Sequence, residues 1–215
     1  MPLPDIARMH AEAIALLAGG DGVLKLQLTR GGGARGYAPN PDAPPFWMLS
    51  LHPLPAPTAS LDLIWCETSL AAQPRLAGLK HGNRLEQVLA AAEVRAAGAG
   101  EGLMRDAGGN AIAATSANLF ALIDGQWQTP ALEACGVAGV MRAWLLAQTE
   151  VLVTTLKPAA IEAAEAVFLC NAVRGILPVR RLGARAWPQL HPRVRALQTT
   201  LARAHPGFEF PLEAS

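Results

Sequence analysis

Lysine is scarce in this chain, and one lysine stands where the sequence changes character. Lys25, Lys80 and Lys157 are the only lysines, against fifteen arginines. Lys80 follows apolar segments broken by Pro and Gly and precedes an alanine-rich stretch. Arginine stays protonated, whereas a desolvated lysine amine loses its proton and can attack a carbonyl carbon to form a Schiff base. Lys80 is therefore a candidate for covalent catalysis, and the alternative is an ordinary surface lysine before a helix.

Two glycine-rich segments could bind an anion. Residues 31–37 would present Arg35, whose guanidinium suits a two-point contact with a carboxylate, beside Tyr37, the only tyrosine. The segment lacks the Gly-Lys-Ser/Thr ending of a phosphate loop, and a plain glycine turn is the alternative. Residues 136–139 lie at the start of a predicted helix whose first backbone amides would be free. There the alternative is a glycine that allows close helix packing.

Composition and charge exclude several classes of function. The net charge is +1 without a long basic run, which argues against a nucleic-acid partner. Neither a signal peptide nor an apolar run of about 18 residues is visible, so we expect no membrane span and a cytoplasmic protein. The five histidines and three cysteines are scattered, so we expect no metal site. A serine nucleophile motif is also absent.

Hydrophobic periodicity predicts an α+β chain in two parts. The first part, residues 1–73, would be a small domain with a helix over 4–18 against a sheet of three strands. A linker over 74–79 would lead to a larger domain, residues 80–215. In the larger domain we expect helices over 83–97, 135–148, 158–164 and 188–204. We expect a hairpin over 102–115, then a strand that ends at 123, and a loop that begins at 129. Further strands are expected over 151–156, 167–172 and 175–179.

Five motifs follow one another over nearly the whole chain. They are residues 29–37, 79–87, 115–120, 136–142, and 168–172 with 178–179. In this order they resemble the class IV, or fold-type IV, pyridoxal-phosphate enzymes, a family of aminotransferases and lyases. The resemblance implies a two-domain α+β fold like that of D-amino-acid aminotransferase and pyridoxal 5'-phosphate as the cofactor.

The same resemblance implies a role for each motif. Lys80 would bind the cofactor covalently and then move the substrate's proton. Arg35 and Tyr37 would receive the substrate carboxylate. Cofactor contacts would come from Asn83, Arg84, Ser116, Asn118, Gly139, Val140, Met141, Asn171 and Ala172, with the phosphate on the backbone of Val140 and Met141. The cofactor supplies an electron sink, while the protein supplies an amine, a phosphate site and an orienting clamp.

The lyase branch of the family gives the best match. It implies elimination of pyruvate from 4-amino-4-deoxychorismate to give 4-aminobenzoate for folate biosynthesis, by a cytoplasmic homodimer with a small-molecule substrate. One alternative is a class IV amino-acid aminotransferase. Another is a shortened, non-catalytic homologue that acts as a binding or dimer-forming protein.

Two departures from the family pattern stand out. Ala113 occupies the position, seven residues before Phe120, where the family usually has a glutamate that pairs with the protonated pyridine nitrogen. Its absence should weaken the electron sink and hurt elimination less than transamination. The family also usually has several dozen residues before the first helix, including an arginine that grips the phosphate. Either the sequence begins at an internal methionine or the chain is a shortened member of the family. In the second case we expect an incomplete small domain that lacks strands, weaker affinity for the phosphate and an exposed sheet edge.

Overall fold

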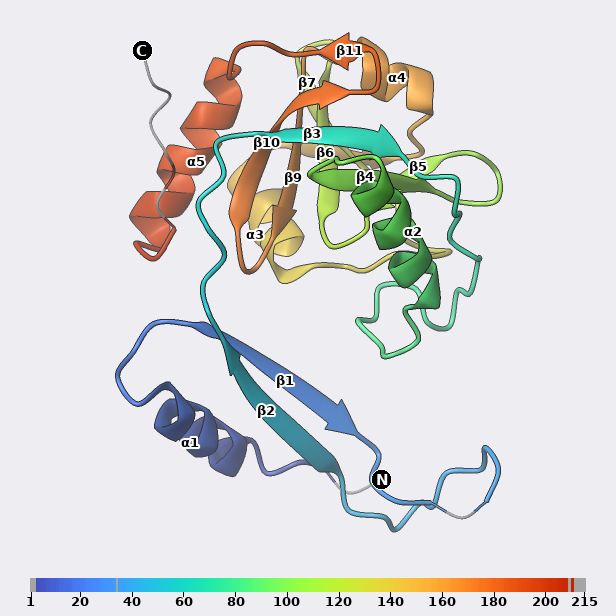
Figure 1. The fold of residues 1–215 in the computed structure, drawn as a ribbon, viewed down its shortest axis with the longest axis vertical. Helices are drawn as coiled ribbons and strands as arrows, with labels where there is room; N and C mark the ends of the chain where they lie inside the picture. Colours follow the sequence, from blue (N-terminus) through green and yellow to red (C-terminus); the bar gives the residue numbers. More distant parts are fainter. Residues whose placement is uncertain (1–2, 34, 209, 211–215) are drawn as a thin grey trace. The chain divides into compact units, whose positions relative to one another are not determined.

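The computed structural model describes residues 3–33, 35–208 and 210 of the chain. The chain divides into two compact units, Met1–Ala56 and Pro57–Ser215 (Figure 1). Within the described residues, no helix is both long enough and apolar enough to cross a membrane.

The first unit is one helix and one hairpin. Its elements are α1 (Ile6–Leu17), β1 (Val23–Thr29) and β2 (Phe46–His52). The two strands are antiparallel over their whole length. Trp47 fastens α1 to β2, because its indole Nε1–H donates to Glu12 over 2.7 Å and its ring lies under the Arg8 guanidinium. The predicted helix and first two strands are confirmed.

The second unit holds the remaining elements. They are β3 (Leu61–Trp65), α2 (Leu85–Ala96), β4 (Glu101–Arg105), β5 (Ala111–Ala114), β6 (Asn118–Ile123), β7 (Gln126–Pro130), α3 (Val140–Gln148), β8 (Val151–Thr154), α4 (Pro158–Ala163), β9 (Ala166–Asn171), β10 (Gly175–Leu182), β11 (Arg185–Ala186) and α5 (Pro192–Ala204). Helix and strand types agree with the sequence prediction for most of them.

Six of these strands close into a barrel (Figure 1). The pairing runs β3–β4–β5–β6–β9–β10 and returns to β3. The pairs that β3 makes with β4 and β10 are parallel, and the others are antiparallel. Strands β7 and β8 extend the sheet from β6, and β11 extends it from β10. Closure removes free edges from these six strands.

Alternation along β6 separates the two cores of this unit. Leu119 and Ala121 belong to the cluster that fills the barrel, together with residues such as Leu103 and Leu169. The intervening residue Phe120 belongs to a second cluster, which α3 and α5 cover. Successive side chains of a strand point to opposite faces, so one apolar strand serves both cores.

The structure differs from the sequence prediction in where the chain divides. The division falls at residues 56 and 57, ahead of the linker expected at 74–79. Strand β3 was expected in the small sheet, but it lies between β10 and β4 in the barrel. Its apolar alternation shows only that one face is buried, and it carries no information on which strands lie beside it.

Three further predictions were wrong in detail. The loop expected from Thr129 is the end of β7, and the short strand β11 was not predicted. The helix expected from Cys135 begins at Val140. Gly136 has φ of 89° and Gly139 has ψ of 147°, so the backbone before Val140 cannot be helical.

Candidate active site

The Lys80 turn, residues 78–84, is stabilised by hydrogen bonds from the side chain of its last residue, Arg84. Arg84 donates from Nη2 to the carbonyl oxygen of Leu79 over 2.6 Å and from Nε to that of His81 over 3.1 Å. These bonds bracket Lys80, whose side chain is exposed. Partial burial lowers the pKa of Arg84 from its usual value. Arg84 thus fixes the backbone on both sides of the predicted catalytic amine.

The start of α3 presents free backbone amides. Gly139 caps the helix without a side-chain hydrogen bond, and the first helical hydrogen bond runs from Ala143 N–H to the Gly139 carbonyl oxygen. The amides of Val140, Met141 and Arg142 therefore have no acceptor within the helix. We call these three amides the α3 cradle. Such a helix start attracts anions because the amides and the helix dipole both favour negative charge.

Asn118 fixes the backbone that leads into the α3 cradle. Its Nδ2 donates to the carbonyl oxygen of Val137 over 2.8 Å. A Cβ atom added to Gly139 would lie 2.2 Å from Asn118 Oδ1, which is too close for any contact. Asn118 is 6% exposed and has little freedom to move. Glycine is therefore needed at 139 because Asn118 packs so close to it. The φ and ψ angles of Gly139 would allow any residue.

A short parallel bridge joins the Lys80 turn to the α3 cradle. Gly78 pairs with Val137. The Gly78 N–H donates to the Gly136 carbonyl oxygen over 3.0 Å, and the Ala138 N–H donates to the Gly78 carbonyl oxygen over 3.0 Å. Lys80 is two residues beyond this bridge on one strand, and Val140 is three residues beyond it on the other. The backbone at Lys80 and the start of α3 are thereby brought to the same edge of the unit.

Ser116 and Asn171 lie at the same edge. Asn171 Nδ2 donates to the Ser116 carbonyl oxygen over 3.3 Å, while its Oδ1 accepts from the backbone amides of Val173 and Arg174. These bonds shape the turn that exposes Ala172. Because β6 pairs with β9 through Asn118 and Cys170, the predicted residues Ser116, Asn118, Asn171 and Ala172 are neighbours.

Glu101 is a residue that the sequence prediction missed. It is 8% exposed, and its carboxylate accepts from the hydroxyls of Thr115 and Ser116 and from the Thr115 amide. It therefore holds the turn that carries Ser116. The only sequence signal is a single acidic residue at the start of a short strand with an apolar middle, which is weak evidence because most such residues are exposed.

Ala113 lies beside Asn118 on the same face of the sheet. The two residues are direct partners in the β5–β6 pair, and directly opposed residues share a face. Ala113 is 7% exposed and packs in a cluster with Met104 and Ile112. The family's glutamate position is thus next to the residues just described, and here it contributes a methyl group.

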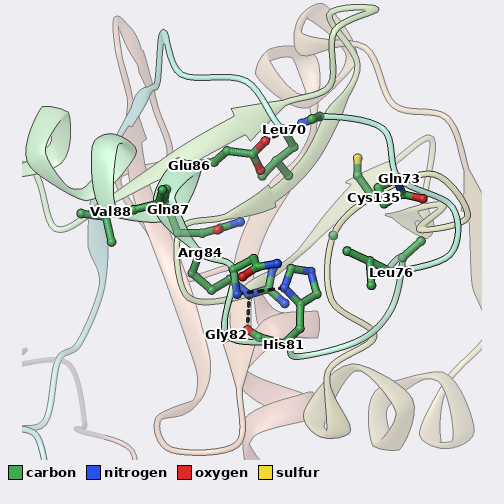
Figure 2. A pocket seen from close by; sticks show the side chains of 15 residues that line it. Leu70, Gln73, Leu76, His81, Gly82, Arg84, Glu86, Gln87, Val88 and Cys135 are labelled. Carbon is green, nitrogen blue, oxygen red and sulfur yellow. Dashed lines mark hydrogen bonds between the residues drawn. The ribbon is translucent and has the colours of Figure 1, made fainter. Parts of the chain in front are cut away.

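Two other predicted residues, Asn83 and Arg84, line a separate cavity. It has a volume of about 450 Å³ and lies between residues 70–77, the Lys80 turn and the start of α2. Figure 2 shows His81 and Arg84 in its wall, with the Arg84–His81 hydrogen bond as a dashed line. Lys80 and the α3 cradle are not among the lining residues. The predicted site residues of the second unit therefore fall into two adjoining groups that share the Lys80 turn.

Arg35 and Tyr37 belong to the first unit. Both lie in the exposed connection between β1 and β2. Their predicted contact with the substrate carboxylate stays a prediction.

Comparison with known proteins gives consistent matches. A model of the amino-transferase class IV family matches residues 1–182. An aminodeoxychorismate lyase of Vibrio harveyi is 37% identical over 171 residues, which are 75% of this chain. The crystal structure of 4-amino-4-deoxychorismate lyase from Pseudomonas aeruginosa superposes with a TM-score of 0.87 at 45% identity, covering 95% of this chain and 79% of that one.

A more distant structure shares the fold. An aminotransferase from Brucella abortus, solved with its cofactor PLP, superposes with a TM-score of 0.77 at 20% identity over 94% of this chain and 77% of that one. This chain spans 63% of the length of the Vibrio harveyi relative.

Proposed function

The chain belongs to the class IV aminotransferase family, and from this premise we propose that it is a pyridoxal-phosphate-dependent lyase that eliminates pyruvate from 4-amino-4-deoxychorismate to give 4-aminobenzoate. The relatives at 37% and 45% identity carry the name of that activity. The observation that carries the proposal is the bridge between Gly78 and Val137, because it joins the segment that carries Lys80 to the segment that leads into the α3 cradle. A phosphorylated aldehyde cofactor needs an amine and an anion site at close quarters.

The residues at this edge fit pyridoxal phosphate. Gly139 lets Asn118 pack against the start of α3, and Asn118 keeps the backbone that leads to the amides of Val140 and Met141 in place. When bound, the cofactor supplies an aldehyde that combines with a lysine amine and a ring that withdraws electrons from the substrate. We assign the phosphate to Gly139, Val140 and Met141, with Ser116, Asn118, Asn171 and Ala172 completing the site.

Lys80 is proposed as the residue that moves the proton. An amine acts as an acid or a base only when its reach and direction are fixed. Arg84 fixes the backbone from which the Lys80 side chain extends, through its two hydrogen bonds to the carbonyl oxygens on either side of Lys80. We expect Asn83 and Arg84 to support the cofactor ring from the Lys80 turn.

Ala113 favours elimination over amino transfer in this proposal. A carboxylate there would stabilise a protonated pyridine ring, and a methyl group cannot. Elimination with a good leaving group depends less on a long-lived negative charge in the ring. In the first unit, Arg35 and Tyr37 are proposed to receive the substrate carboxylate, since a guanidinium and a phenol are suitable donors for it.

A second copy of the chain is proposed to cover the outer face of α2. Leu85, Val88 and Leu89 are 78%, 61% and 60% exposed on this helix. Exposed apolar faces of this kind are typical of protein interfaces. We propose a cytoplasmic homodimer, and sedimentation of the purified protein as a monomer would argue against the dimer.

The cofactor proposal has a direct spectroscopic test. The purified protein should gain visible absorption on addition of pyridoxal phosphate, and borohydride should fix the cofactor to the peptide that contains Lys80. Lys80→Ala should lose the fixed adduct, whereas Lys157→Ala, a change at an exposed lysine before α4, should keep it. A protein that takes up no cofactor would refute the proposal. Release of pyruvate from the substrate then separates a lyase from an aminotransferase.

A further inference from the structure

Arg142 is a buried cation in the first turn of α3. It is 8% exposed. Its guanidinium donates from Nη2 to the Pro130 carbonyl oxygen over 3.0 Å and from Nε to Thr129 Oγ1 over 3.4 Å. Thr129, fully buried, in turn donates to the Leu119 carbonyl oxygen over 2.7 Å. The side chain therefore ties the start of α3 to β7 and, through Thr129, to β6.

The charge of Arg142 is unfavourable in the protein alone. The ion pairs found among the described residues involve Arg8, Arg180 and Arg181, and no carboxylate lies within ion-pair distance of Arg142 there. Burying a cation against neutral carbonyl and hydroxyl oxygens leaves most of its desolvation cost uncompensated. The N-terminal turn of a helix adds to this cost, because the helix dipole repels positive charge there.

Burial also lowers the pKa of Arg142, because removing the guanidinium from water disfavours its charged form. The guanidinium nevertheless stays charged at neutral pH, since arginine does not lose its proton under these conditions. A neutral side chain of similar length could donate to Pro130 without this cost. The charge itself therefore needs an explanation beyond packing.

A bound dianion supplies that explanation. The backbone N–H of Arg142 is one of the three amides of the α3 cradle, and its guanidinium extends from the same turn to Thr129 and Pro130 of β7. We infer that Arg142 is an electrostatic positioning residue, whose buried charge raises the affinity of the α3 cradle for a phosphate dianion while its hydrogen bonds hold the first turn in place. The inference rests on the proposed phosphate site at α3 and is independent of the chemistry at Lys80.

The same contacts explain why a neutral substitute would not serve. In a medium of low dielectric constant, attraction between a buried cation and a nearby dianion is far stronger than in water. Hydrogen bonds to ionised groups are correspondingly stronger than those between neutral groups. The free energy lost by burying Arg142 is recovered when the anion binds, so stability and phosphate binding should be linked at this residue.

Three variants separate charge from packing. Arg142→Gln removes the charge and keeps a donor for Pro130, and Arg142→Lys keeps the charge with fewer donors. Arg105→Gln is the control, since Arg105, at the end of β4, is half-buried and likewise donates to a carbonyl oxygen, that of Cys66. Inorganic phosphate is the probe. Calorimetric titration gives its dissociation constant, and thermal unfolding compares phosphate with chloride at equal ionic strength.

We expect removal of the charge to affect stability and phosphate affinity differently. Arg142→Gln should match or exceed the wild type in stability in chloride, yet bind phosphate about tenfold more weakly. Arg142→Lys should stay within about threefold of the wild-type affinity, because a lysine keeps the charge. Arg105→Gln should bind phosphate as the wild type does.

Three results would overturn the inference. They are a wild-type protein that does not bind phosphate, an Arg142→Gln protein that binds it as the wild type does, and an Arg142→Lys protein that loses as much affinity as Arg142→Gln. If Arg142→Gln does not fold, the lysine variant decides alone: wild-type affinity supports the inference and a tenfold loss refutes it. Failure of cofactor fixation at Lys80 would refute the proposed function and leave these phosphate measurements unaffected.

Discussion

Gly139→Ala tests the close approach of Asn118 to the α3 cradle. The backbone at Gly139, with φ of −68° and ψ of 147°, is open to alanine. Replacing glycine where the backbone is permissive normally stabilises a protein by about 0.4–1 kcal/mol through the unfolded state. The clash instead predicts that Gly139→Ala destabilises the protein. The new Cβ would lie 2.2 Å from Asn118 Oδ1, more than 1 Å short of ordinary contact.

The size of the destabilisation follows from the displacement of Asn118. Asn118 is 6% exposed, and its Nδ2 holds the Val137 carbonyl oxygen at 2.8 Å. Overpacking a buried site costs about 1–3 kcal/mol, and a lost hydrogen bond costs about 1 kcal/mol more. After the unfolded-state gain is subtracted, we expect Gly139→Ala to lower the free energy of unfolding by about 2 kcal/mol. Affinity for phosphate should fall as well, since α3 must shift.

Urea unfolding followed by tryptophan fluorescence measures this change, because Trp127 and Trp187 are buried in the second unit. The matched control is Gly207→Ala, where an added Cβ would meet no atom within 4 Å, and it should stay within about 0.5 kcal/mol of the wild type. In the Asn118→Ala background, Gly139→Ala should cost little, because the clashing oxygen is gone. Equal stability of Gly139→Ala and Gly207→Ala would refute the reasoning.

Two further changes test other parts of the site and its surroundings. Burial, aided by the carboxylates of Glu93 and Glu101, raises the pKa of the Cys66 thiol from 9.0 to about 11. Since the folded pKa is the higher one, stability from the neutral thiol is complete below pH 9 and is lost as pH rises toward about 11. Over this pH range, urea unfolding should show that the free energy of unfolding declines less steeply for Cys66→Ala than for the wild type. An identical slope for the two proteins would contradict the raised pKa of Cys66. Ala113→Glu should raise the aminotransferase side activity, measured as amino transfer to a 2-oxo acid, and unchanged amino transfer would count against the role given to Ala113.

The sequence predicted elements well where a local pattern decides them. Helices α1 and α2 and the β4–β5 hairpin follow from apolar spacing and turn residues, which act within a few positions along the chain. The start of α3 was placed too early, because residues 135–139 have suitable composition while the φ of Gly136 is set by the contacts around it. Composition alone does not report such contacts.

Long-range pairing was beyond the reach of local pattern. The bridge of Gly78 with Val137 positions Lys80 beside the α3 cradle, and neither glycine nor valine signals a partner so far along the chain. The family resemblance supplied that proximity, whereas periodicity did not. The buried charges Glu101 and Arg142 were missed as structural residues for a related reason: charged side chains are usually exposed, and only the fold shows where they are enclosed.

The closed barrel also dictates an order of events during synthesis. Strand β3, which begins at Leu61, has β10 as one of its two parallel neighbours, and the register includes Leu63 against Leu182. A ribosome must therefore release almost the whole chain before β3 gains its second partner. Until then the nascent protein carries an open apolar sheet, and such edges invite pairing with other chains. Closure between distant segments is slow because chain entropy opposes it. Assembly of the Lys80 edge should consequently be a late, post-translational step for which chaperone protection of the unfinished barrel matters most.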